Sequence, residues 1–205
     1  MRRRSFLLLA TAAASAAARR RARAQAAGPA APVEKLDGAL LQIMKLGTAT
    51  PFVQRAAVLR PVIEDVFDLP EILRVSVGLR WPSFSADDRA KLLDVFTRYP
   101  VASYVANFDS FKGQTFRILP QQRSVGADRV VATELVPTSG DATRIDYQMR
   151  RAGAGWRVVD VLLDGSISRV AVNRSDFRSL LGSGGPERLI TSLERKVTNL
   201  QSGSS

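Results

Sequence analysis

Residues 144–181, RIDYQMRRAGAGWRVVDVLLDGSISRVAVNRSDFRSLL, decide the fold of this chain. The pattern predicts a strand, a glycine turn at residues 153–155, a second strand over Trp156–Leu163, and a turn at Gly165 into a helix. The second strand is apolar on both faces, with Trp156, Val158 and Leu162 on one and Val159, Val161 and Leu163 on the other. Such a strand must be covered on both faces, or must line an apolar space.

Three more strands are predicted before this one, over Gln114–Leu119, Arg129–Val136 and Thr143–Arg150. Short segments rich in glycine, proline and aspartate separate the strands, so consecutive strands should pair as an antiparallel meander. The strand over Thr143–Arg150 alternates between apolar and polar residues, which predicts one buried face and one wet face.

Helices are predicted on both sides of the sheet segment. Their ranges are Val33–Met44, Phe52–Phe67, Pro70 to Gly78, a helix capped by Ser85 that runs to Phe108, Ser166–Leu181 and Pro186–Leu200. Pro61 predicts a kink or break near Leu59–Arg60, and Pro100 predicts an interruption of the helix that Ser85 begins. The order of the elements predicts an α+β fold, with helices packed on a twisted four-stranded antiparallel sheet.

The first 26 residues have a basic start followed by an apolar run, Phe6–Ala18, that is too short to span a membrane. We interpret residues 1–26 as a secretory signal peptide, cleaved near Ala24 or Ala26. Because Arg3 and Arg4 precede Ser5-Phe6-Leu7-Leu8, the leader also resembles a twin-arginine signal, and both export routes stay open. The expected organisation is a flexible lead-in at 27–32, one domain at 33–200 and a tail at 201–205, located in the periplasm.

Composition argues against two function classes. The formal net charge is +11, but seven arginines lie in the first 23 residues, and the remainder carries only +4. The case for nucleic-acid binding is therefore weak. The chain has no Cys and no His, so catalysis would have to rest on carboxylates, Lys, Tyr or Ser, which makes an enzyme a less favoured interpretation.

Two groups of charged residues have alternative interpretations. Asp160, Asp164 and Asp146 could form a carboxylate cluster, but Asp164 is more simply a turn residue and Asp160 a partner for an arginine. Arg169, Arg174 and Arg178 are expected on one helix face. They could be a solvated stripe, or a docking surface for an acidic partner or lipid headgroups.

Several short motifs follow one another along nearly the whole mature chain: Leu59-Arg60-Pro61, Phe67-Asp68, Ile145-Asp146-Tyr147, Gly155-Trp156-Arg157-Val158-Val159-Asp160-Val161 and Gly165-Ser166-Ile167-Ser168. In this order and spacing they resemble the MlaC, or toluene-tolerance, family of periplasmic phospholipid-binding proteins. Ser76-Val77-Gly78 with Trp81, and the run Ser166-Ile167-Ser168-Arg169-Val170-Ala171, are similar to the hopanoid-associated HpnM-type branch.

The resemblance implies a soluble shuttle that carries phospholipid or hopanoid between the inner and outer membranes. Its partners would be an inner-membrane ABC-type lipid transporter and an outer-membrane lipoprotein complex. It also implies a cone-shaped fold, similar to cystatin and nuclear transport factor, with an apolar cavity between helices and sheet. No catalytic residue, cofactor or metal follows from it. The expected lining residues are Phe67, Ile72, Phe96, Tyr104, Phe108, Tyr147, Met149, Trp156, Val158, Val161 and Ile167.

Two rival interpretations remain at the level of sequence. An enzyme of the same cone-shaped fold would act on a hydrophobic or isoprenoid substrate through Asp146, Tyr147 or Asp160. An adaptor protein would instead fill the space between helices and sheet with ordinary core packing, in which case the aromatic residues would be core residues.

Overall fold

The computed structural model describes residues 28–182 and 185–203. The predicted signal peptide at 1–26 lies outside the described residues. The helices are α2 (Ala30–Leu46), α3 (Phe52–Val66), α4 (Leu69–Val77), the 3-10 helix η1 (Gly78–Ser83), α5 (Ala86–Asn107), α6 (Arg169–Leu181) and α7 (Glu187–Ser202). The strands are β1 (Thr115–Val125), β2 (Asp128–Val136), β3 (Thr143–Ala152), β4 (Gly155–Leu163) and β5 (Ile167–Ser168).

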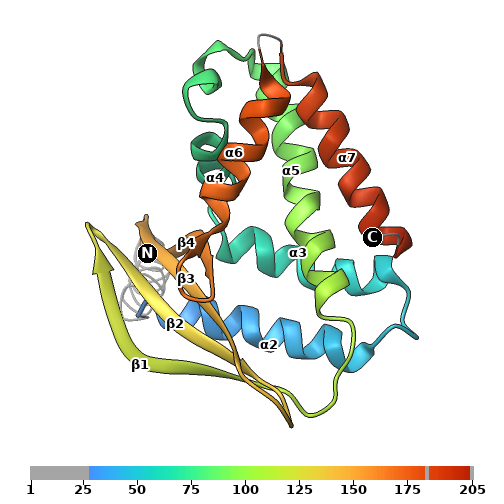
Figure 1. The fold of residues 1–205 in the computed structure, drawn as a ribbon, viewed down its shortest axis with the longest axis vertical. Helices are drawn as coiled ribbons and strands as arrows, with labels where there is room; N and C mark the ends of the chain where they lie inside the picture. Colours follow the sequence, from blue (N-terminus) through green and yellow to red (C-terminus); the bar gives the residue numbers. More distant parts are fainter. Residues whose placement is uncertain (1–27, 183–184, 204–205) are drawn as a thin grey trace, which may run out of the picture.

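The fold is α+β, as predicted, with an antiparallel sheet in the order β1-β2-β3-β4-β5. Figure 1 shows α2 lying along the curved sheet, while α5 and α7 run side by side with α6 beside them, in a second group of helices. Among the described residues, no helix has the length and apolarity needed to cross a membrane.

Side-chain N-caps fix the first residue of three helices, α4, α5 and α6. Asp68 accepts a hydrogen bond from the Glu71 amide at the start of α4, Ser85 accepts one from Asp88 at the start of α5, and Ser168 accepts one from Ala171 at the start of α6. These caps satisfy amides that have no partner inside the helix. The predicted helix over Ser166–Leu181 begins only at Arg169, because Ile167 and Ser168 pair with β4 as an additional short strand.

Neither internal proline breaks its helix, so the predicted interruption at Pro100 is wrong and the predicted break at Pro61 does not occur. Pro61 lies inside the continuous helix α3, and Pro100 lies inside the continuous helix α5. Pro61 is exposed, and so is Ala57, whose carbonyl loses its helical partner. Water can bind that carbonyl, so the missing hydrogen bond costs less than it would in the core.

The side chains of β4 do not alternate as predicted, because the strand contains a bulge at Val159. Met149 of β3 pairs with Val158, but its neighbour Gln148 pairs with Asp160, so Val159 is an extra residue. An extra residue shifts the alternation of all that follow it. Val158 and Val161 therefore share one face, although simple alternation would place them on opposite faces.

The other face of the sheet is also less wet than predicted. Asp146 on β3 has no exposed surface, and its carboxylate pairs with Arg144 at 3.0 Å and with Arg123 at 3.6 Å. Asp128 on β2 accepts hydrogen bonds from Gln148 and Arg150 in the same way. Ion pairs thus cover this face, and the arginines extend over it with their charged ends near solvent.

Asp160 fixes the transition from the sheet to α6. Its carboxylate accepts hydrogen bonds from the amides of Val161 at 2.8 Å and Val170 at 3.0 Å, and from the Ser168 hydroxyl. No arginine binds it among the described residues, contrary to the sequence interpretation. Asp164 is a turn residue, as predicted, with a positive φ of 51°.

We expect Asp160→Ala to lower the free energy of unfolding by about 2 kcal/mol, because two amides and a hydroxyl lose their acceptor. Urea denaturation of the purified mature protein measures this loss. Asp141→Ala, in the exposed segment between β2 and β3, is the matched control and should change stability little. Equal stabilities of the two variants would contradict the structural role of Asp160.

Candidate functional site

The predicted lining residues gather where the helices pack on the sheet. Phe67, Ile72, Phe96, Tyr147, Met149 and Val158 belong to one cluster of buried apolar side chains. Tyr104, Phe108, Trp156 and Val161 are half-buried and pack against that cluster. The structure does not bring Ile167 there: its side chain is 51% exposed, because the two-residue strand β5 lies at the edge of the sheet.

The register of β3 and β4 explains this arrangement. Tyr147 lies opposite Val161, and Met149 lies opposite Val158 after the bulge. The segment between α3 and α4 joins the free side of β4, where the Asp68 amide binds the Val158 carbonyl at 2.9 Å. This contact holds the neighbouring Phe67 against the same face of the sheet.

A row of aromatic rings runs through this interior from the helices to the sheet edge. The rings of Phe67 and Tyr104 lie 6.1 Å apart, Tyr104 stacks on Phe108 at 5.7 Å, and Phe108 lies 6.0 Å from Phe116 of β1. Phe116 was not among the residues expected from sequence. Phe116 lies opposite Leu135 of β2, and both residues are in strands that the sequence predicts to pair, so its position could have been inferred from sequence.

A polar group of three residues, Asp37, Tyr104 and Tyr147, is embedded in this apolar interior. Asp37 is 7% exposed and Tyr147 is fully buried. Burial raises the pKa of Asp37 to about 7, with a smaller contribution from the nearby charge of Glu34. Burial also raises the pKa of both tyrosines, and each of them interacts electrostatically with Asp37 and with the other.

Asp37 was missed at the sequence level, although a signal was present. In α2, Val33, Asp37, Leu40 and Met44 recur at helical spacing, so the carboxyl group replaces an apolar residue on the buried stripe. A carboxyl group at such a position is unusual, because carboxylates are almost never fully buried without a partner.

A surface hollow of about 390 Å³ opens at one end of the interior. It is lined by Gly28, Ala31, Pro32, Lys35, Asp65, Ala152, Gly155, Trp156 and Arg157. Lys35 of α2 and Asp65 of α3 form an ion pair of 2.6 Å at this hollow. Trp156 contributes to the hollow and also packs against the buried cluster, so it links the surface to the interior.

Basic groups surround Trp156. The guanidinium of Arg151 lies 5.0 Å from the centre of the Trp156 ring, and Arg157 donates hydrogen bonds to the carbonyls of Glu64 at 3.1 Å and Phe67 at 3.2 Å. Arg157 thereby satisfies carbonyls at the end of α3. The hollow therefore combines an apolar wall with positive charge at its edge.

The three arginines expected to share a face of α6 are placed differently. Arg169 is half-buried and close enough to lower the pKa of Tyr104, Arg174 extends over Gly78, and Arg178 is exposed. Five residues along a helix turn through about 140° beyond a full turn, so Arg169 and Arg174 point in different directions.

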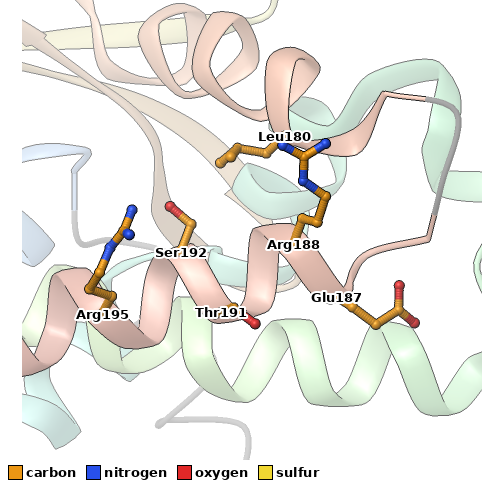
Figure 2. Close-up of a pocket in the computed structure, with 6 residues that line it drawn as sticks. All are labelled: Leu180, Glu187, Arg188, Thr191, Ser192 and Arg195. Atoms are coloured by element: carbon orange, nitrogen blue, oxygen red, sulfur yellow. The ribbon is translucent and has the colours of Figure 1, made fainter.

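A second hollow, of about 300 Å³, lies between α6 and α7. Figure 2 shows Arg188 reaching toward Leu180 of α6, with Ser192 and Arg195 further along the same side of α7. Neither Arg188 nor Arg195 has an ion-pair partner within residues 28–182 and 185–203. Two arginines against one glutamate, Glu187, make this hollow net basic, and Leu180 in its wall packs against the buried cluster.

The family model described as MlaC protein matches residues 34–195 of this chain, a range that begins within α2 and ends within α7. The chain belongs to the MlaC family. Its structure is also similar to that of the phospholipid-binding protein from Ralstonia solanacearum in complex with a phospholipid, with a TM-score of 0.72 and 20% sequence identity. The match covers 85% of this chain and 99% of the other. A comparison with curated proteins finds no match.

Members of the MlaC family are non-enzymatic lipid carriers, so we assign no catalytic residue. Asp146 and Asp160, the carboxylates considered at the sequence level, both have structural partners. Within the described ranges, no group of three or more acidic residues is arranged to hold a metal ion.

The raised pKa of Asp37 predicts a pH-dependent stability. Between its ordinary value of 3.8 and about 7, the native carboxyl is protonated while the unfolded one is ionised. Since the native state then binds more protons, the free energy of unfolding falls as pH rises through this range, by up to about 1.4 kcal/mol per pH unit.

Asp37→Asn should remove this contribution, and urea denaturation across the range should show a flatter profile than wild type. Asp141→Asn, on the exposed segment, should keep the wild-type profile. Parallel profiles for wild type and Asp37→Asn would show that Asp37 titrates normally in the folded protein.

Proposed function

We propose that this protein binds a phospholipid, or a hopanoid, with its apolar chains in the interior between helices and sheet. The observation that carries the proposal is the position of Trp156, which belongs both to the surface hollow and to the packing around the buried cluster. Family membership and the lipid in the similar Ralstonia structure support it.

The energetics suit such a cargo. Burying apolar chains is favourable by about 0.8 kcal/mol per CH₂ group, so two acyl chains can provide ample binding energy without any reactive group. In this structure the lining side chains touch one another. Cargo would therefore enter by separating the helices from the sheet, starting from the hollow at Trp156.

The edge of that hollow suits an anionic headgroup. Arg151 and Arg157 lie on the two strands that form it, and Lys35 is on α2, where its ion pair with Asp65 is exposed. A phosphate at the surface could interact with these cations while the acyl chains enter beneath Trp156.

We further propose that the protein is exported to the periplasm by the signal at residues 1–26 and folds as one domain over 33–200. There it would act as a shuttle between the two membranes, receiving or delivering lipid at an inner-membrane ABC-type transporter and an outer-membrane lipoprotein complex. The basic hollow between α6 and α7, with the exposed Arg178, suits an acidic surface on such a partner.

Quenching by a phospholipid with brominated acyl chains tests both binding and location, because the chain has only two tryptophans. Bromine quenches a tryptophan that it contacts. In Trp81→Phe, the remaining Trp156 should be strongly quenched by the brominated lipid and not by the same lipid without bromine.

The matched variant is Trp156→Phe, which keeps Trp81 in η1 beside Phe84 and Arg89. We expect little quenching in this variant. Quenching of Trp81 alone would place the lipid elsewhere on the molecule, and no quenching of either tryptophan would contradict phospholipid binding.

A further inference from the structure

The polar group inside the apolar interior has unused hydrogen-bonding capacity. Oδ1 of Asp37 and the hydroxyl oxygen of Tyr147 are both buried and have no hydrogen-bond partner among the described residues. The Tyr104 hydroxyl is near enough to affect the pKa of Tyr147, but no hydrogen bond of good geometry joins Tyr147 to it. Burying such groups without partners is costly, and most buried polar atoms in proteins are satisfied.

The surroundings of this group are otherwise apolar. Tyr147 lies between Val131 of β2 and Val161 of β4, and Tyr104 packs between the rings of Phe67 and Phe108. Among the described residues, two charged side chains outside this group affect its pKa values: Glu34 on α2 contributes to raising that of Asp37, and Arg169 on α6 opposes the rise at Tyr104. A few convergent polar atoms in an apolar site are the usual means of orienting a small ligand.

We propose that Asp37, Tyr104 and Tyr147 form a subsite for a hydroxyl group carried on the apolar part of the bound lipid. This inference rests on the proposed lipid-binding function and adds a ligand class, a lipid with a hydroxyl on the portion that enters the protein. A plain acyl chain offers these atoms nothing.

A hydroxyl group suits this subsite better than an ester carbonyl. A hydroxyl donates one hydrogen bond and accepts others, so it can donate to Asp37 and accept from Tyr147. An ester carbonyl only accepts, and so could not satisfy an ionised Asp37. The hydroxyl also serves both protonation states, because a protonated Asp37 can donate to it.

Two pairs of lipids test the subsite. The first pair is a phosphatidylcholine with one palmitoyl and one stearoyl chain, and its counterpart with a hydroxyl in the middle of the stearoyl chain. The second pair is cholestanol and cholestane, which differ in one hydroxyl on a rigid ring system. Competition within each pair for delipidated mature protein is measured by native mass spectrometry.

We expect wild type to prefer the hydroxylated member of at least one pair by about tenfold, the effect of one well-made hydrogen bond in a dry site. The pair that shows the preference identifies the source of the hydroxyl, a modified acyl chain or a polycyclic lipid. Tyr147→Phe should reduce the preference to near unity, because it removes the hydroxyl that pairs with the hydroxyl of the lipid. Because this variant removes only an unsatisfied hydroxyl, it should remain folded.

The control is Tyr99→Phe, since Tyr99 lies on α5 beside Lys196 of α7 and outside the polar group. It should keep the wild-type preference. Equal binding of both members of both pairs by wild type would overturn the subsite and leave the proposed function standing, as would a preference that survives in Tyr147→Phe. Failure of all four lipids to bind would overturn the proposed function as well.

Discussion

The pairing of β3 with β4 is the constraint on which the interior depends. Val159 adds one residue to β4, and this bulge turns Val158 and Val161 to the same face as Tyr147 and Met149. Without the extra residue, one of the two valines would point to the opposite face, where Asp146 and its arginines form ion pairs. The bulge therefore decides which side chains the helices cover.

Much of this fold could be predicted from sequence, because periodicity and turn residues are local signals. The helix α2, the caps at Ser85 and the four long strands were all evident from spacing alone. The helix breaks considered at Pro61 and Pro100 do not occur, and at Pro61 the lost hydrogen bond faces water, where a helix tolerates it. The bulge at Val159 was also missed, since it depends on how two strands register and not on the composition of either.

For the candidate site, sequence indicated the residue types better than the directions in which they point. The rings of Phe67 and Tyr104 pack against each other, with Phe67 held by its bridge to β4 after the end of α3 and Tyr104 lying on α5. Ile167 was expected in the lining but lies at the exposed edge of the sheet, where a short strand pairs on one side only. Asp37 was overlooked because apolar neighbours in α2 masked a carboxyl group at a buried position.

The account rests on one claim, that the interior between helices and sheet holds lipid. The most direct measurement is native mass spectrometry of the mature protein, exported by bacteria and purified without detergent. We predict a population heavier than the bare chain by the mass of a single lipid, which gentle collisional activation releases as an intact lipid ion. Protein that is consistently lipid-free, fully folded and unable to take up added phospholipid would contradict the claim, and the interior would then be an ordinary core.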